Sequence, residues 1–143
     1  MNKPQSLFLV CFLLFSSLFA FNSYADEVTI DWKNGAYTGD MSKGVPNGEG
    51  TWKVLDVGWY YGEFKNGELH GIGMQEYVDG TRYAGEYKNT TRSGQGWFMF
   101  GEGDFKGISF IGEFKNNVPW HGTEYDKDFN VIAIYSDGVK TGK

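Results

Sequence analysis

Two histidines are the side chains of this sequence best suited to acid–base chemistry. His70 and His121 each stand immediately before a glycine, in equivalent positions of two repeated segments. A general base needs a fixed partner that orients it beside the substrate. The same position holds Asn47 and Ser93 in the other two segments. A position that accepts Asn, Ser and His is a polar turn position, so we interpret both histidines as structural.

Three glutamates form a second candidate set. Glu63, Glu86 and Glu113 stand in one register, and each is followed two residues later by a lysine, namely Lys65, Lys88 and Lys115. Paired carboxylates could hydrolyse glycosides if one had a raised pKa, but adjacent lysines favour the ionised form. We therefore interpret the set as cross-strand charge pairs, each contributing ~0.2–1 kcal/mol. No phosphate loop, Ser-His-Asp spacing or EF-hand pattern is present. We expect a non-enzyme with no catalytic residue, metal site or cofactor.

Residues 1–25 have the pattern of a secretory signal peptide. Lys3 precedes an apolar run from 7 to 21, and small residues follow at the positions that a signal peptidase reads, which predicts cleavage before Asp26. The alternative is a retained anchor, but about 15 apolar residues are short of the ~20 that span a bilayer. The single cysteine, Cys11, would leave with this segment. We therefore expect an exported protein, periplasmic or secreted.

Residues 26–143 are long enough for one domain with a modest core. Their net charge is 12 − 18 = −6, because the leader contains one lysine and no acid among the 13 basic and 18 acidic residues of the chain. Nucleic acids and anionic membranes select basic surfaces, so this balance argues against both as the main partner. Asn89 begins a glycosylation sequon, which matters only in a eukaryotic host.

A repeat of 23 residues dominates the chain after the leader. An aromatic-x-Gly triplet occurs four times, with glycines 23, 23 and 27 residues apart, at Tyr37/Gly39, Tyr60/Gly62, Tyr83/Gly85 and Phe110/Gly112. A Gly-x-Gly pair follows the first three triplets, at Gly48/Gly50, Gly71/Gly73 and Gly94/Gly96. The fourth unit keeps only Gly122, displaced by one residue, and its lead-in carries four extra residues. Such a period indicates stacked copies of one supersecondary unit.

Turn dipeptides separate short alternating segments, as expected for hairpins. Asn34-Gly35, Asn66-Gly67, Asp79-Gly80 and Asp137-Gly138 combine residues that accept the positive φ of two-residue hairpin turns. Alternation places aromatic, glycine and aromatic residues on one face of each strand. Glycine permits close approach, so rings from neighbouring strands could lie flat against the backbone. The sequence predicts an all-β fold of tandem hairpins without a second layer.

The pattern resembles the MORN repeat, whose consensus is Tyr-x-Gly-x4-Gly-x3-Gly-x-Gly. The first two units fit every position, whereas the third has Thr90 and the fourth Asn117 in place of the middle glycine. The resemblance implies an elongated, twisted single-layer antiparallel sheet, with units near 37–59, 60–82, 83–105 and 110–125 and a C-terminal capping strand. MORN repeats are known as protein-interaction and dimerisation modules, and phospholipid binding has been attributed to them.

Aromatic residues outside the repeat pattern are the candidate binding surface: Trp59, Tyr61, Trp97 and Trp120. Clustered exposed rings often mark contact sites, although these could instead cover sheet ends or pack under the chain termini. We expect a protein-interaction or scaffolding module that binds a protein partner or itself. Two alternatives are a cell-wall or carbohydrate-binding module and acidic phospholipid binding, the latter disfavoured by charge.

Overall fold

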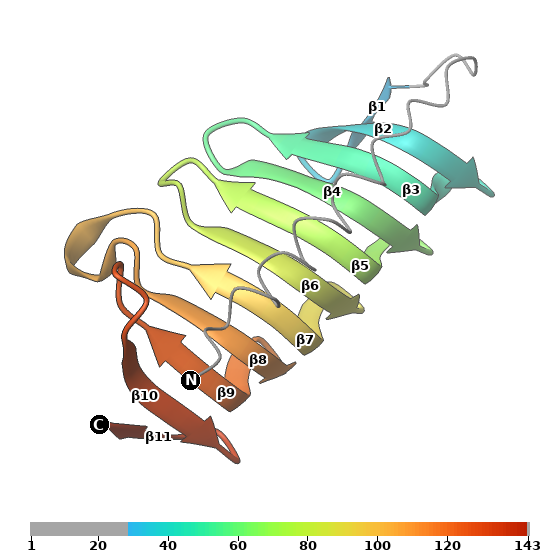
Figure 1. Ribbon diagram of the computed structural model, residues 1–143. Coiled ribbons are helices and arrows are strands. Elements are labelled where there is room, and N and C mark those ends of the chain that lie inside the picture. Colours follow the sequence, from blue (N-terminus) through green and yellow to red (C-terminus); the bar gives the residue numbers. More distant parts are fainter. Residues whose placement is uncertain (1–28, 143) are drawn as a thin grey trace.

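A single antiparallel sheet makes up this protein, seen here in a computed structural model that describes residues 29–142. The predicted leader and its cleavage site lie outside the described residues. Eleven strands pair in chain order, which confirms the expected all-β fold of tandem hairpins. They lie side by side in one twisted layer, with β1 and β11 at its two ends (Figure 1). No helix in the described part of the chain is long and apolar enough to cross a membrane.

The strand bounds follow the repeat. The strands are β1 (Thr29–Trp32), β2 (Gly35–Ser42), β3 (Val45–Val54), β4 (Gly58–Lys65), β5 (Glu68–Tyr77), β6 (Arg82–Lys88), β7 (Thr91–Met99), β8 (Ser109–Lys115), β9 (Val118–Tyr125), β10 (Val131–Ser136) and β11 (Val139–Gly142). A three-residue 3-10 turn, η1 (Gly103–Phe105), lies in the loop between β7 and β8. This loop contains the four extra residues of the fourth unit.

Two-residue turns with positive φ at both positions connect most strands. Asn66-Gly67 and Asp137-Gly138 have these angles, as predicted. The first predicted turn is shifted by one residue, because Lys33 and Asn34 take positive φ while Gly35 begins β2 and pairs with Trp32. At the predicted Asp79-Gly80 turn, Gly80 alone has positive φ. The register of each hairpin follows from these turns.

An unbroken row of eight glycines crosses the sheet from β2 to β9. Each is the direct cross-strand partner of the next, in the order Gly39, Gly50, Gly62, Gly73, Gly85, Gly96, Gly112 and Gly122. The missing side chains leave a shallow channel, and the repeated aromatic rings lie in it. A β-carbon on Gly96 would come within 2.6 Å of the Tyr83 hydroxyl oxygen, and one on Gly112 within 3.0 Å of the Phe110 ring. The period thus brings a bare backbone and a flat ring together.

The core is a chain of eight aromatic rings on this same face, which we call the aromatic face. Successive centroids are 4.9–5.2 Å apart and every contact is edge to face, in the order Tyr37, Phe64, Tyr60, Tyr87, Tyr83, Phe114, Phe110 and Tyr135. Such contacts contribute about 0.5–1.5 kcal/mol each beyond the area they bury. A one-layer sheet therefore obtains a buried core without a second layer, as the alternation predicts.

The fourth unit keeps the hairpin in spite of its displaced glycine. Gly122 pairs with Gly112 in the glycine row although it follows Gly112 by 10 residues rather than 11, because the register shift between Glu113 and Phe114 contains one additional residue where the second unit has two. The chain then continues into hairpin β10–β11, where Tyr135 packs against Phe110. At the other end, Trp32 of β1 packs against the core.

Candidate functional site

Each complete repeat contains a β-bulge in which an acidic side chain binds a backbone amide. The Glu63 carboxylate accepts a 2.9 Å hydrogen bond from the Ile72 N–H, and Glu86 accepts a 2.7 Å bond from the Gln95 N–H. The preceding glycines, Gly71 and Gly94, have positive φ, which turns those N–H groups out of the ladder. Both hydrogen bonds lie at the exposed surface, where the carboxylate supplies the acceptor that the ladder does not.

This bulge corrects our interpretation of the glutamates as partners of the lysines. Among residues 29–142, no ion pair joins Glu63, Glu86 or Glu113 to Lys65, Lys88 or Lys115. The carboxylates of the first two are directed to the bulge instead. Within the repeat their role is structural.

The repeated tyrosines complete the bulge from the aromatic face. The hydroxyl groups of Tyr37, Tyr60 and Tyr83 donate to the carbonyl oxygens three residues on, at 2.7, 3.0 and 3.0 Å. Burial raises the pKa of Tyr37 to about 12, and the neighbouring Asp40 carboxylate adds to the shift. Burial likewise raises the pKa of Tyr60 and Tyr83. These hydroxyl groups are neutral hydrogen-bond donors. The fourth unit has no such hydroxyl group, because Phe110 stands at the position of the tyrosine.

The histidines do not form a catalytic pair. His70 lies on β5 and His121 on β9, four strands apart, which is roughly 19 Å at ~4.8 Å per strand. Nδ1 of His70 is buried without a hydrogen-bond partner among residues 29–142. His121 contacts Asp137 instead, with Nε2 3.4 Å from Oδ1 and the Asp137 N–H directed at Nδ1. Each histidine is instead the cross-strand partner of a repeat glutamate, His70 of Glu63 and His121 of Glu113.

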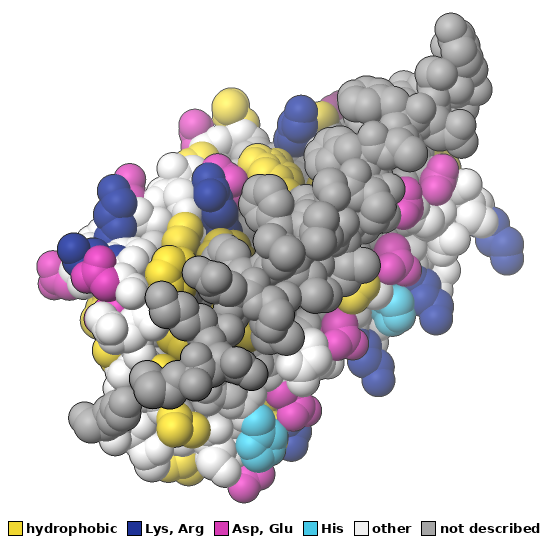
Figure 2. All heavy atoms as spheres, viewed as in Figure 1, with side chains coloured by type: hydrophobic (Ala, Val, Ile, Leu, Met, Phe, Trp, Pro, Cys, Tyr) yellow, Lys and Arg dark blue, Asp and Glu magenta, His cyan; other side chains and the backbone are white. Residues whose placement is uncertain are grey.

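The sheet face opposite the core, which we call the opposite face, carries an apolar row across five adjacent strands. Tyr61, Met74, Ala84, Trp97 and Ile111 are successive cross-strand partners from β4 to β8. Threonines continue the row on both sides, at Thr38, Thr51 and Thr123. We call the five central residues the apolar row. Figure 2 shows acidic and basic side chains toward both ends of the strands.

Two of the four aromatic residues singled out from the sequence thus lie in one row, and two do not. Tyr61 and Trp97 are in the apolar row, separated by Met74 and Ala84. Trp59 stands two residues before Tyr61 on β4, between Lys53 and Glu76 of the neighbouring strands. Trp120 lies apart from the row, where the Lys115 ammonium group is 4.1 Å from its ring centroid and Gly138 packs against its edge.

Trp97 has a polar group that the fold leaves unsatisfied. Its indole Nε1 is buried and has no hydrogen-bond partner in the described part of the chain. An unsatisfied donor costs about 1–3 kcal/mol. Threonine occupies the same row elsewhere without this cost, so sheet formation alone does not require a tryptophan at this position.

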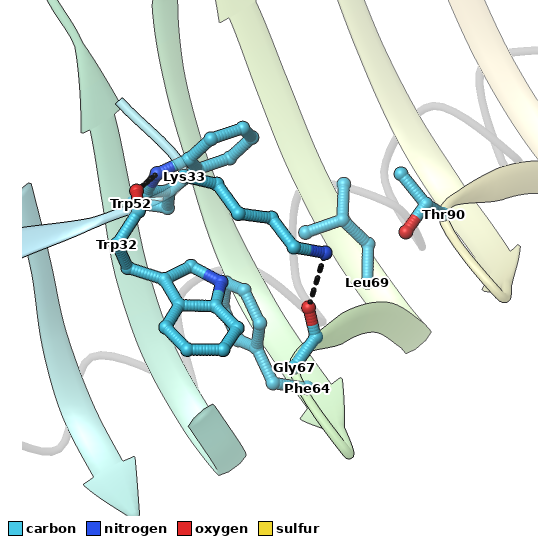
Figure 3. Close-up of a pocket in the computed structure, with 7 residues that line it drawn as sticks. All are labelled: Trp32, Lys33, Trp52, Phe64, Gly67, Leu69 and Thr90. Atoms are coloured by element: carbon cyan, nitrogen blue, oxygen red, sulfur yellow. Dashed lines mark hydrogen bonds between the residues drawn. The ribbon is translucent and has the colours of Figure 1, made fainter. Parts of the chain in front are cut away.

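The aromatic face contains two adjoining hollows that share the side chains of Trp52, Leu69 and Thr90. The smaller has a volume of about 30 Å³, roughly one water molecule. It lies between Trp32 and Trp52, with the Lys33 ammonium group bonded to the Gly67 carbonyl oxygen at 3.0 Å (Figure 3). The Trp52 indole N–H donates to the Trp32 carbonyl oxygen at 2.9 Å, so these side chains are held in place.

The larger hollow is a groove of about 290 Å³, close to the lower end of the ~300–1,000 Å³ typical of ligand sites. We call it the Arg92 groove. Its lining residues are Trp52, Leu69, Gln75, Tyr77, Tyr87, Thr90, Arg92 and Asn117. None of these eight is acidic. Aromatic walls and side-chain amides surround one guanidinium group in this groove.

Arg92 is held among aromatic rings. Its Cζ lies 5.2 Å from the ring centroid of Phe98, 5.5 Å from that of Tyr83 and 6.0 Å from that of Phe114. The Asn117 side-chain oxygen accepts from the Arg92 backbone N–H at 2.8 Å and from Nε at 3.5 Å. No hydrogen bond or ion pair within residues 29–142 uses the two terminal nitrogens, so four N–H donors remain free.

We did not identify this groove from the sequence, yet the repeats contain a signal for it. Arg92 pairs with Tyr87 at the position where other hairpins place Pro46, Leu69 and Pro119. Gln75 similarly falls in the row that holds Trp52 and Phe98. Replacement of an apolar residue by a polar one at a repeated core position marks the groove. Polar residues that break the period therefore indicate a candidate site as well as aromatic ones.

A metal centre has no support from the side chains. No group of three or more His, Cys, Asp or Glu residues within 29–142 is placed to hold a metal ion. The acidic side chains are instead spread along the sheet, several of them engaged at bulges.

Comparison with protein families gives a direct match to these repeats. The model of the MORN repeat matches residues 37–53, 60–82 and 83–105. The fourth hairpin, with its displaced glycine and its phenylalanine in place of tyrosine, lies beyond the matched residues. A search of curated proteins found no match to the chain. The matched repeats, the glycine row and the aromatic core agree, and the chain belongs to the MORN-repeat family.

Proposed function

We propose that this MORN-repeat protein is a non-catalytic, exported interaction module that binds a protein partner, or a second copy of itself, through the apolar row. MORN repeats are commonly interaction modules, which supports the general class. The apolar row supports the particular surface. It runs across five strands on the face that does not contain the core, and threonines replace it toward both ends of the sheet.

The observation that carries this proposal is the contrast between the two faces. The aromatic face buries its rings within the chain, so its apolar character serves folding. The apolar row on the opposite face does not form a comparable buried core within the sheet. The buried indole N–H of Trp97 on that face has no hydrogen-bond partner among residues 29–142. Large aromatic residues in a flat apolar patch are typical centres of protein interfaces. No assembled set of groups among residues 29–142 supports a catalytic alternative.

Affinity capture with crosslinking tests the proposal. The full-length chain is expressed in a bacterial host with its leader in place, and complexes are crosslinked before capture. We expect one or a few proteins, or a second copy of this chain, to be crosslinked through strands β4–β8. Recovery of no specific protein, together with sedimentation as a monomer only, would rule the proposal out.

A second candidate function is carbohydrate binding, favoured by the Arg92 groove. Trp52 and Tyr77 offer aromatic surface, and Gln75 and Asn117 offer side-chain amides at the same hollow. Binding of this kind uses the aromatic face and so does not compete with the apolar row. Co-sedimentation with peptidoglycan and other insoluble polysaccharides tests it, and failure to bind any of them would remove it.

A further inference from the structure

We infer that the Arg92 groove binds an acidic sugar unit, with the carboxylate held by the two terminal nitrogens of Arg92. This inference rests on the second candidate function and names the chemistry of its ligand. The first observation is the unpaired guanidinium group of Arg92. The chain is acidic overall, yet Arg92 makes no ion pair within residues 29–142 and no lining residue of its groove is acidic.

The number of cations favours a single negative charge. Arg92 is the only basic residue among the eight that line the groove. Lys33 lines the neighbouring hollow, but its ammonium group is bonded to the Gly67 carbonyl oxygen. A guanidinium fork matches the two oxygens of one carboxylate in a bidentate pair. A phosphate group or a strongly acidic peptide would bring more charge than one arginine offsets.

The remaining free groups of the groove favour a sugar ring beside that carboxylate. The amide nitrogens of Gln75 and Asn117 and the hydroxyl of Tyr77 make no hydrogen bond within the described residues. These donors surround walls made by Trp52, Tyr77 and Tyr87. Rings of this kind pack against the C–H faces of a pyranose, while the amides reach its hydroxyl groups. The volume of about 290 Å³ suits one ring-sized unit.

The position of the groove in the sheet argues against an extended peptide. Its lining residues come from strands β3, β5, β6 and β7 and from the turns that follow β6 and β8. All of these strands are interior strands with a neighbour on both sides. A peptide therefore has no free backbone edge there to extend the sheet, which is the usual source of affinity for extended peptides. Recognition at this site must come from side chains.

The inference is tested by measuring the binding of three defined acidic sugars. Calorimetry and NMR titration are carried out on the full-length chain after processing. The probes are tetragalacturonate, a hyaluronan tetrasaccharide and N-acetylmuramic acid, each compared with its methyl ester. We expect at least one acid to bind tenfold or more tightly than its ester. Arg92→Leu, which installs the residue found at the equivalent position 69, should abolish this preference while the protein stays folded. Arg92→Lys should reduce it.

A matched control removes the same charge from the opposite face. Arg82→Leu breaks an exposed ion pair with Glu76 and should leave sugar binding unchanged. Equal binding of acid and ester would overturn the inference while leaving carbohydrate binding in place. No binding of any sugar, including insoluble polysaccharides, would overturn both. Tighter Arg92-dependent binding of a glutamate-rich peptide than of every acidic sugar would also overturn it, and would identify the groove as a peptide site.

Discussion

The Tyr83 ring lies directly against the backbone of Gly96, so a β-carbon on Gly96 would come within 2.6 Å of the Tyr83 hydroxyl oxygen and 2.7 Å of ring atom Cε2. The same relationship joins the tyrosine of each complete repeat to the second glycine of its Gly-x-Gly pair. It explains why tyrosine and glycine recur together. The ring needs the bare backbone, and the glycine is stabilised in a strand by the ring that covers it.

Replacement of Gly96 by alanine tests this relationship. Gly96 does not have positive φ, so the substitution acts through steric overlap with the buried Tyr83 ring. We expect Gly96→Ala to lower the free energy of unfolding by about 1–3 kcal/mol, as overpacking does. Gly142→Ala is the control, because a β-carbon there has nothing within 4 Å. Urea denaturation measures both, and equal stability of the two variants would refute the packing argument.

Removal of the bulge acceptor should destabilise the repeat. Glu86→Ala leaves the Gln95 N–H without its 2.7 Å acceptor, and because this N–H lies at the exposed surface we expect a cost of about 0.5–1.5 kcal/mol. Glu86→Gln retains a side-chain oxygen and should cost less. Glu113→Ala is the control, since the fourth unit has no corresponding bond among the described residues, and a change within about 0.5 kcal/mol is expected. Thermal unfolding of the three variants decides the matter, and similar losses for all three would contradict this role.

Alkaline pH should weaken the fold through its buried tyrosines. Burial raises the pKa of Tyr37 to about 12, and burial also raises those of Tyr60, Tyr83 and Tyr87, from an ordinary value of 10.0. A folded-state pKa above the unfolded one gives stability that is complete below pH 10 and is lost as pH rises toward 12. Urea midpoints at pH 8, 10, 11 and 11.5 should therefore fall only above pH 10. A midpoint that stays constant to pH 11.5 would contradict the expected burial.

Thr90 occupies a turn position that favours glycine. Its φ is 63°, an unusual value for a β-branched residue, and the equivalent turns use Gly44 and Gly67. Thr90→Gly should relieve about 1–2 kcal/mol of strain, reduced by the ~0.5–1 kcal/mol entropic cost of glycine. We expect a small rise in melting temperature. Thr91→Gly, within strand β7, should lower it, and a lower melting temperature for Thr90→Gly would show that Thr90 is held without strain.

The repeat made most of the fold predictable, because a period of 23 residues places the same aromatic and glycine residues on the same face each time. Alternation within Tyr60–Gly62–Phe64 was enough to predict rings lying against a bare backbone. Alternation did not predict the bulge. Two additional residues of β5 lie opposite Glu63, and they change which backbone N–H groups lack a partner in the ladder. The Glu-x-Lys spacing therefore suggested ion pairs where the structure has carboxylate–amide bonds.

The candidate surfaces were predictable only in part. Tyr61 directly follows Tyr60 and Trp97 directly follows Gly96, so alternation places both on the face opposite the repeat tyrosines and glycines. The Arg92 groove depends on side chains from separate strands and turns, whose meeting requires the register of four hairpins. Trp120 could not be placed from the pattern, since it lies at the register shift of β9.

Capture of a partner by the wild-type chain and by the double variant Tyr61→Thr/Trp97→Thr tests the proposed function most directly. Threonine is the residue that the same row uses at Thr51 and Thr123, so the variant should remain folded. Ile134→Thr, which changes the same row beyond Thr123, is the control. We predict that the crosslinked partner is recovered with the wild type and the control and is lost with the double variant. Undiminished recovery with a folded double variant would contradict binding through the apolar row.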